Sequence, residues 1–506
     1  MTTLNRRNFL TLGSITTTAV FLSQCSRRSP LDTSVATSKV LSKSTPITQP
    51  KMYYSQDGLL RVDLTAQTQS IQLGDGLSEL ASRHHTAQLL AYNGQVPGPC
   101  LEAKPGDTVQ IRFTNQLNQP TNLHFHGLHI SPEIDNVFRE VPPEEQHIYE
   151  FQIPIDHPAT TAWYHPHYHL NVAEQVFGGL AGPFIIRGDV DNIPEINQAE
   201  EAVLVLQDVG IDSQGTVVNP HSLAKKWGRE GEVLRANGQQ NPVVAIPQNS
   251  LLRLRLINAS ASRIYKLQLQ GHPWFLMATD RGAIPQPIEQ DTVILSPGER
   301  AELLIPGQQE PGDYRLINLP YDRGLEEMVD AFGLSSGQLP GVALPKEQAI
   351  ATLRYQPSHR ATPLALPQSL ATVELLPDPI TTREFVLDHG LDATAPTTGF
   401  TINGQSFAMN RVNTQVHLNQ VEDWHIINKA SMDHPFHLHT NRFQVMARNG
   451  QPEPLIVWKD TVNIKAYETV TIRVRFDDFT GRTVYHCHIL DHEDQGMMGV
   501  LDILES

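Results

Sequence analysis

The sequence predicts an all-β protein made of three consecutive β-sandwich domains. Two observations support this prediction. The 506 residues include 36 prolines and 33 glycines, a composition that favours many short strands joined by turns over long helices. A pattern of turn and alternating strand also occurs three times along the chain, whose length corresponds to about three domains of ordinary size.

The first recurring element is an Asn-Gly-Gln turn that leads to a strand closed by an asparagine. The turns lie at 93–95, 237–239 and 403–405, and the strands that follow lie at 108–115, 250–258 and 423–428. Asn-Gly is typical of tight turns between antiparallel strands, and apolar and polar residues alternate in each strand as they do in a half-buried β-strand. The three units are therefore expected to be copies of one motif.

A second alternating strand recurs towards the end of each unit. It lies at 146–153, 299–305 and 469–476, and each copy leads to a strand that contains a tyrosine, namely Tyr164, Tyr314 or Tyr485. Several short strands with regular turn signals indicate a multi-strand sandwich. We expect domains at 51–190, 191–355 and 373–506, with a proline-rich linker at 356–372.

The N-terminal residues 1–25 are predicted to be an export signal. Arg6 and Arg7 precede a moderately apolar stretch and resemble a twin-arginine signal, which implies the twin-arginine export machinery as a partner and a periplasmic or other extracytoplasmic location. The alternative is a disordered basic tail. The apolar stretch is shorter than the roughly 20 residues that a membrane span needs, so no integral span is expected.

The residues after this signal are predicted to form a flexible tether. The stretch 26–50 is rich in serine, threonine and proline, as flexible tethers are. Cys25 stands where a lipoprotein cleavage site would place its cysteine. Gln24 occupies the preceding position, where a small residue is usual, and this argues against lipid anchoring while leaving it as an alternative.

Charge and cysteine content exclude several classes of protein. The formal net charge is −16 and no basic run follows the N-terminus, which excludes a nucleic-acid partner. The acidity either attracts cationic substrates or serves solubility alone. Three cysteines are too few for a disulfide framework. Cys100 is predicted to be a small buried residue, and Cys487 needs an explanation of its own.

The protein is expected to be a monomer.

Most of the informative histidines occur in four clusters. They are His124 and His126; His165 and His167; His434, His437 and His439; and His486, His488 and His492 around Cys487. Residues two apart on a strand face the same side, so a His-x-His pair presents two imidazoles that can converge on a metal ion. Imidazole alone suits copper, zinc, iron and nickel, so the histidines do not identify the metal.

Cys487 narrows the choice to copper. One thiolate, two histidines and a weak axial methionine form the donor set of a blue-copper electron-transfer site, and Cys487, His492, Met497 and His434 provide that set. His486 and His488 flank the cysteine and should point to the opposite face of the strand. One strand would then connect a thiolate copper site to a histidine-only site, for which eight histidines in four pairs remain.

The middle unit lacks these ligands. Where the first unit has His124 and His126, the middle unit has Gln268 and Gln270, and its strand after Tyr314 contains neither histidine nor cysteine. We therefore expect the middle domain to share the scaffold without binding copper.

The four motifs, in this order, resemble those of the multicopper oxidases over essentially the whole chain after the signal. The resemblance implies three cupredoxin-like Greek-key domains that bind one type 1, one type 2 and two type 3 copper ions. It assigns His434, Cys487, His492 and Met497 to type 1 copper and His124 and His437 to type 2. The type 3 ligands would be His126, His165 and His488 for one ion and His167, His439 and His486 for the other.

The resemblance also implies an activity. Dioxygen and a small reducing substrate would be the partners, and one-electron oxidations of the substrate would be coupled to the four-electron reduction of dioxygen to water. Asp135 and Glu493 would supply protons, unless both are only solvated or structural carboxylates. The substrate is expected to donate electrons at an exposed edge of His434 or His492.

The substrate class is narrowed by the methionine content. Relatives that oxidise cuprous ions carry methionine-rich inserts, whereas residues 321–375 contain only Met328. We therefore expect a laccase-like oxidase of phenols or other organic reductants. A metallo-oxidase acting on Cu(I), Fe(II) or Mn(II) is the alternative. A non-catalytic exported cupredoxin scaffold is a third hypothesis, against which the complete ligand set argues.

Overall fold

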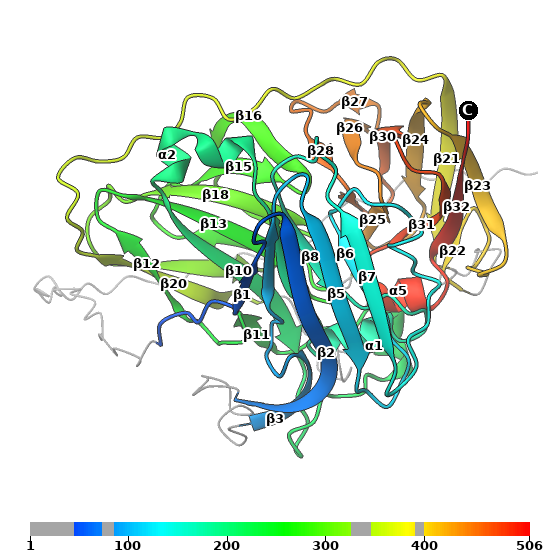
Figure 1. Cartoon of the computed structure of the whole chain (residues 1–506), viewed down its shortest axis with the longest axis horizontal. Coiled ribbons are helices and arrows are strands. Elements are labelled where there is room, and N and C mark those ends of the chain that lie inside the picture. Colours follow the sequence, from blue (N-terminus) through cyan, green and yellow to red (C-terminus); the bar gives the residue numbers. More distant parts are fainter. Residues whose placement is uncertain (1–44, 73–85, 325–345, 390–398) are drawn as a thin grey trace, which may run out of the picture. The chain divides into compact units, whose positions relative to one another are not determined.

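The structure is a computed structural model that describes residues 45–72, 86–324, 346–389 and 399–506. Strands dominate the described chain and form three β-sandwiches (Figure 1), which confirms the predicted all-β fold class. The predicted export signal and the predicted tether as far as residue 44 lie outside the described residues. No described helix is long and apolar enough to cross a membrane.

The first sandwich pairs a sheet of order β1-β4-β9-β8-β6 with a sheet of order β3-β2-β5-β7. Its elements are β1 (Met52–Tyr54), β2 (Leu59–Gln72), β3 (Thr86–Tyr92), β4 (Cys100–Ala103), β5 (Thr108–Asn115), β6 (His124–His126), β7 (Gln146–Gln152), β8 (Thr160–His165), α1 (Val172–Phe177) and β9 (Gly182–Ile186). In β5, Val109, Ile111 and Phe113 are buried and alternate with more exposed residues, as the sequence period predicts.

The middle sandwich pairs a sheet of order β11-β10-β13-β18-β15-β16 with one of order β12-β20-β19-β14-β17. Its elements are η1 (Asp189–Asn192), α2 (Pro194–Asn197), β10 (Glu200–Val209), α3 (Ser222–Trp227), β11 (Val233–Ala236), β12 (Val243–Pro247), β13 (Leu251–Asn258), β14 (Tyr265–Leu269), β15 (Phe275–Thr279), β16 (Gly282–Glu289), β17 (Val293–Leu295), β18 (Arg300–Pro306), β19 (Asp313–Leu319) and β20 (Gln348–Gln356).

The third sandwich pairs a sheet of order β22-β21-β24-β30-β26-β27, to which β28 adds at β26, with one of order β23-β32-β31-β25-β29. Its elements are β21 (Thr381–Asp388), β22 (Thr401–Ile402), β23 (Val412–His417), β24 (Val421–Asn428), β25 (His434–Leu438), β26 (Phe443–Arg448), β27 (Gln451–Pro452), β28 (Trp458–Lys459), β29 (Thr461–Ile464), β30 (Thr469–Arg475), β31 (Gly481–Cys487), α5 (Leu490–Asp494) and β32 (Met498–Leu504).

The three Asn-Gly-Gln turns have the same structure. Asn93, Asn237 and Asn403 all adopt positive φ, as do the glycines that follow them, which is the conformation that favours Asn-Gly in tight turns. Each asparagine side chain accepts a backbone N–H from the neighbouring strand, donated by Thr65, Val205 and Val386 respectively. The repeat inferred from sequence is therefore a repeated hydrogen-bonded clamp.

The asparagines that close the recurring strands also share one role. Asn115, Asn258 and Asn428 each accept the N–H of the residue two positions ahead and donate to two or more backbone carbonyls. All three side chains are buried, so these bonds satisfy polar groups that would otherwise be unpaired.

Two segments predicted to be tether and linker are bound to the middle sandwich. The backbone of Thr45 and Ile47, at the end of the predicted tether, exchanges hydrogen bonds of 2.8 Å with Val243 at the start of β12. Leu364 and Leu370 of the predicted linker are buried, and their N–H groups donate to Asn249 and Pro285. A free sheet edge and an apolar surface explain these contacts, and neither is visible in local composition.

Candidate metal centres

The strand ends of the first and third sandwiches bring the predicted ligands together. His124 on β6 pairs with His165 on β8, and His437 on β25 pairs with His486 on β31. The two domains then meet directly. The Nδ1 atom of His126 lies 3.3 Å from Nε2 of His488, and Nε2 of His167 lies 3.1 Å from Nε2 of His486.

The histidines form several buried groups whose candidate ligand atoms lie within 4.8 Å of one another. These groups are His124, His437 and His439; His167, His439 and His486; His124, His126 and His165; and His126 and His437 with Asp460. His488 joins them through His126. The structure thus collects all eight predicted ligands of the histidine-only site, and among the described residues no such group includes a residue of the middle domain.

Cys487 is the centre of a separate group. Its Sγ atom lies 3.4 Å from Nδ1 of His434 and 3.8 Å from Nδ1 of His492, and those two nitrogens are 3.2 Å apart. Met497 is buried in the same core, and its carbonyl accepts the N–H of Cys487. Burial raises the pKa of the thiol, so a bound cation is needed to stabilise the thiolate there.

The imidazole nitrogens of the cluster cannot all be satisfied by hydrogen bonds to one another, whereas metal ions would satisfy them. Burial, and then neighbouring histidines, hold the pKa values of His126, His167 and His486 well below the usual range, so these imidazoles are neutral. Nitrogens 3.0 to 3.3 Å apart share at most one proton, and Nε2 of His124, His165 and His437 has no hydrogen-bond partner among the described residues. Neutral imidazoles with free lone pairs beside one thiolate suit copper.

Asp135 contacts the histidine cluster from the first domain. Its carboxylate lies 2.9 Å from Nδ1 of His124 and 3.4 Å from Nδ1 of His439, and it accepts the N–H of Phe125. Burial alone would raise the pKa of Asp135. The interaction with His124, through charge and through a hydrogen bond, is part of a larger opposing effect, so the pKa is lowered. Asp135 is therefore an ionised group that orients two histidines.

Glu493 contacts the opposite side of the cluster and is in the opposite state. Its oxygens lie 3.5 Å from Nδ1 of His167 and 3.3 Å from Nδ1 of His486, without hydrogen-bond geometry. Complete burial, and then the nearby charge of Asp494, raises its pKa well above the usual range. The pKa values of the two predicted acids are therefore shifted in opposite directions.

Asp460 and Arg300 adjoin the cluster and were not predicted from sequence. Asp460 lies 3.2 Å from Nε2 of His126, and its carbonyl is 2.8 Å from Nδ1 of His437. Arg300 of the middle domain donates two hydrogen bonds of 2.7 Å to Asp460, and also donates to carbonyls of Thr161 and Asp280. One buried guanidinium therefore joins all three sandwiches behind the histidines.

The turn before Arg300 touches the histidines directly. Gly298 has a φ of +86°, and a Cβ placed there would lie 2.8 Å from atoms of His126 and His488. Only glycine allows the backbone to approach so closely in this conformation. Nothing in the local sequence distinguishes Gly298 from an ordinary turn glycine, so this contact could not be predicted.

The expectation of an exposed type 1 histidine is wrong. His434 and His492 are both 0% exposed, because the phenyl ring of Phe400 stacks on His492 at 4.1 Å and α3 of the middle domain covers the site. Nε2 of His492 lies 3.0 Å from the carbonyl of Lys226 in α3. A buried, doubly hydrogen-bonded ion pair between Arg229 and Asp491 fixes this cover to α5.

The remaining histidines singled out by their neighbourhood lie outside the metal groups. His129, His147, His169 and His272 occur in none of the groups found among the described residues. His272 is buried and contacts the hydroxyl of Tyr355 at 3.0 Å, which gives it a structural role. Cys100 is fully buried on β4 beside Trp163, as predicted for a small apolar side chain.

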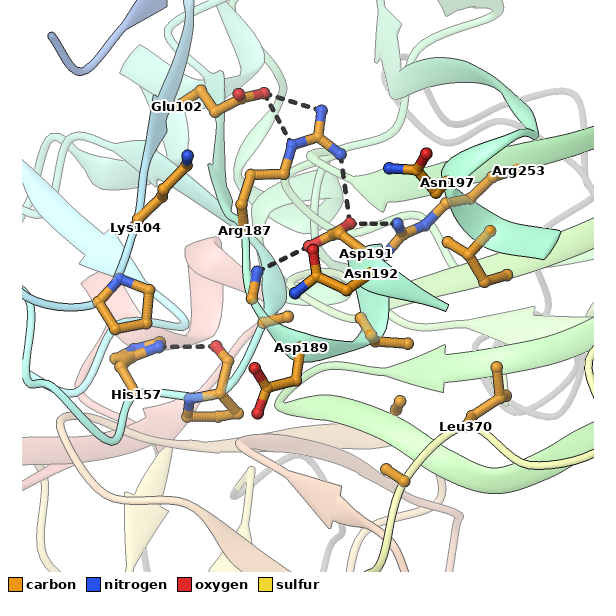
Figure 2. A pocket seen from close by; sticks show the side chains of 18 of the residues that line it. Glu102, Lys104, His157, Arg187, Asp189, Asp191, Asn192, Asn197, Arg253 and Leu370 are labelled. Carbon is orange, nitrogen blue, oxygen red and sulfur yellow. Dashed lines mark hydrogen bonds and ion pairs between the residues drawn. The ribbon is translucent and has the colours of Figure 1, made fainter. Parts of the chain in front are cut away.

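A cavity of about 1020 Å³ lies apart from these centres. It is lined by residues of the first and middle sandwiches and by residues 370–372 of the predicted linker, and it contains no predicted copper ligand. Figure 2 shows that several of its charged residues pair with one another: Arg187 pairs with Glu102 and Asp191, and Asp191 pairs with Arg253. The charges of these four residues compensate one another.

Comparison with known protein families agrees with the geometry. Three multicopper oxidase family models match residues 78–191, 190–331 and 378–506, one for each sandwich. The chain therefore belongs to the multicopper oxidase family, whose members are copper-dependent oxidoreductases. This result also identifies the three sandwiches as cupredoxin domains, as the sequence predicted.

Individual relatives show what the family includes. A multicopper oxidase of Staphylococcus epidermidis is 29% identical, covering 83% of this chain and 85% of the relative. The cell division protein FtsP of Yersinia pestis is 30% identical, covering 83% and 86%.

Solved structures agree with these matches. A multicopper oxidase from Campylobacter jejuni described as a metallo-oxidase superposes with a TM-score of 0.78 at 29% identity, covering 92% of this chain and 96% of the other. A laccase-like oxidase from Ochrobactrum sp., with activity towards lignin model compounds, superposes with a TM-score of 0.75 at 26% identity, covering 91% and 100%.

Proposed function

We propose that this protein is a laccase-like multicopper oxidase that oxidises phenols or other organic reductants and reduces dioxygen to water. The observation that carries the proposal is the position of Cys487. Its sulfur forms a triangle with Nδ1 of His434 and Nδ1 of His492. The neighbouring His486 and His488 contact His167 and His126 of the first domain. The end of β31 therefore joins a thiolate site to a histidine cluster.

The ligand assignment follows the family pattern. Type 1 copper would be held by His434, Cys487, His492 and Met497, and type 2 copper by His124 and His437. One type 3 ion would be held by His126, His165 and His488, and the other by His167, His439 and His486. The last three form one of the buried groups, which supports the assignment. The bound copper ions would supply one-electron transfer and dioxygen reduction.

The two acids would have separate roles in supplying protons. Reduction of one dioxygen molecule to two waters consumes four electrons, taken from four one-electron oxidations of substrate, and four protons. The ionised Asp135 would orient His124 and His439, and the protonated Glu493 would deliver protons from beside His167 and His486. Their opposite pKa shifts support this division.

Electrons would enter through the cover over the type 1 site. Because His492 contacts the carbonyl of Lys226 and is not exposed, we expect the reductant to dock against α3 of the middle domain. Substitutions on the exposed part of α3 should then alter KM for the reductant more than kcat, because they change docking and leave both metal sites intact.

The nature of the reductant is tested by oxygen consumption. Purified enzyme would be assayed with a panel of phenols and, separately, with Cu(I), Fe(II) and Mn(II). The scarcity of methionine in residues 321–375 favours the phenols, whereas the similarity to a metallo-oxidase supports the alternative of a metal-ion substrate. Phenols that are inert while Cu(I) alone consumes oxygen would overturn the laccase-like proposal.

A non-catalytic scaffold is the alternative suggested by the similarity to cell division proteins. Elemental analysis separates the two. An oxidase with the proposed ligands should bind about four copper ions per chain. A chain that binds none after copper loading would be a scaffold.

Export is the last part of the proposal. Arg6 and Arg7 support transport by the twin-arginine machinery to an extracytoplasmic location. Replacing both with lysine should leave the precursor inside the cell, and undiminished export would contradict this proposal.

A further inference from the structure

A small pocket of about 70 Å³ lies where the three sandwiches meet, and no predicted copper ligand lines it. The first sandwich contributes His129, Asp156, His157 and Pro158, the middle one contributes Arg281, and the third contributes Asn441, Arg442, Arg475, Asp477 and Asp478. The pocket is far smaller than the roughly 300–1,000 Å³ typical of organic ligand sites. It therefore suits a small ion.

Two buried side chains that line this pocket have unused hydrogen-bond donors. Arg281 and Asn441 are each 2% exposed. Nε of Arg281 and Nδ2 of Asn441 have no hydrogen-bond partner among the described residues. Leaving such donors unpaired away from solvent is unfavourable, more so for a charged group, so an acceptor in the pocket would stabilise both.

The guanidinium group of Arg442 also lies in the wall of the pocket. Arg442 stacks on the ring of Trp458 at 4.0 Å, and within the described part of the chain it forms no hydrogen bond or ion pair. Burial is the largest influence on both guanidinium groups and lowers the pKa of Arg442 and of Arg281, the latter to about 10, although nearby acids, first Glu374 for Arg442 and Asp460 for Arg281, act in the opposite direction. The positive charge of the two guanidinium groups is thus incompletely compensated.

Within the described residues, no acid of the wall forms a hydrogen bond or ion pair with Arg281 or Arg442, although Asp477 and Asp156 lie near enough to raise the pKa of Arg442. Asp477 is held by Arg475 at 2.8 Å, and Asp478 is exposed and lies 3.2 Å from His129. Asp156 is also exposed. Burial and then Arg281 lower the pKa of both histidines, that of His157 to about 3, which disfavours a positive charge on either.

We propose that this pocket binds a small oxyanion of the sulfate or phosphate class, held by Arg281, Arg442 and Asn441. Guanidinium groups present planar pairs of N–H donors that match two oxygens of such an ion, and charge-assisted hydrogen bonds are the stronger kind. The same donors would bind sulfate and phosphate alike. The inference goes beyond the proposed oxidase activity and does not depend on the reductant.

The bound oxyanion would act on the neighbouring cluster through Thr440. The carbonyl of Thr440, the residue after His439, accepts from Arg281 at 3.3 Å and lies 3.0 Å from Nδ1 of His129. Arg281 also lies 3.8 Å from Asp460. An ion that fixes Arg281 would therefore restrain the segment carrying His439 without touching the histidines.

The test is calorimetric titration of the purified, copper-loaded full chain with inorganic sulfate at constant ionic strength, repeated with inorganic phosphate. We expect saturable binding of one ion per chain. Arg442→Gln, at a half-buried position outside the metal centres, should weaken binding by about tenfold or more, because it removes one charge-assisted contact.

The matched control is Arg482→Gln, which makes the same change in net charge at an exposed position on β31 outside the pocket wall. It should bind sulfate as the unmodified chain does. The absence of saturable binding to the unmodified chain would overturn the proposal. Equal binding by Arg442→Gln would also overturn it, because the ion would then occupy another site.

Discussion

The first and middle sandwiches share the same turns and strands, but only the first has histidines at the strand end that is predicted to bind metal. Both contain the Asn-Gly clamp and the closing asparagine, and β6 of the first corresponds to the end of β14 in the middle one. On β6 the repeated positions are the buried His124 and His126, whereas the middle domain has the half-buried Gln268 and Gln270. Clamps and strands therefore build the scaffold, and a few side chains at one strand end decide whether it binds metal.

The middle sandwich nevertheless contributes to the centres of its neighbours. Gly298 approaches His126 and His488, Arg300 holds Asp460 behind the cluster, and Lys226 contacts His492. The middle domain, whose described residues form no candidate metal group, thus contacts the predicted ligands of the other two. The comparison teaches that loss of metal binding in one repeat is compatible with a role in supporting the metal sites of the others.

The largest effect is expected when the first domain is made to resemble the middle one. His124→Gln combined with His126→Gln removes ligands from the histidine cluster and leaves the Cys487 group intact. Oxygen consumption should fall by more than about a hundredfold, and copper content should drop while the blue colour of the thiolate site remains. Elemental analysis, visible absorption and an oxygen electrode measure these outcomes, and full activity would contradict the ligand assignment.

A smaller but still large effect is expected at Arg300. Arg300→Met leaves the buried carboxylate of Asp460 without its main partner, which should lower the free energy of unfolding by about 3–5 kcal/mol. Copper affinity of the cluster should fall by about 10–100-fold. Denaturant unfolding and copper titration measure the two effects.

The control for this variant is the removal of both charges. Arg300→Met combined with Asp460→Asn should be more stable than Arg300→Met alone, because no buried charge is left unpaired. Arg300→Lys keeps the charge and loses the two-pronged contact, so an intermediate result is expected. If Arg300→Met changed neither stability nor copper affinity, the supporting role of the middle domain would be refuted.

The smallest effect is expected for the reverse change. Gln268→His combined with Gln270→His restores the histidine pair in the middle domain, but the paired strand β19 places Ile317 opposite Gln268, where β8 places His165 opposite His124. Without converging ligands, copper per chain should not rise, and stability should change by no more than about 0.5 kcal/mol. An additional bound copper ion would show that the scaffold alone makes a site.

The features that could be predicted from the sequence are local ones. Asn93 and Gly94 fix a turn through their own backbone preferences, and His124 and His126 share a face because a strand has a period of two. The fold class and the grouping of the histidines follow from such rules together with the family pattern.

The features that were missed depend on contacts between domains. Asp460 and Arg300 meet only when the middle and third sandwiches pack together, and nothing beside either residue in the sequence indicates the other. The cover over His492 is a short helix from another domain, so an exposed histidine edge was a reasonable expectation that tertiary packing reversed. Burial of a side chain by another domain depends on how the domains pack together, which local sequence does not reveal.

The central claim is that Cys487 serves one metal site while its strand serves two, and Cys487→Ser tests it most directly. A hydroxyl is a poor copper ligand, so the type 1 ion and its blue colour should be lost. His486 and His488 remain, so the chemically reduced variant should still bind the other copper ions and react with dioxygen, while substrate oxidation collapses. A variant that stays blue and active, or one that loses all its copper, would contradict this account.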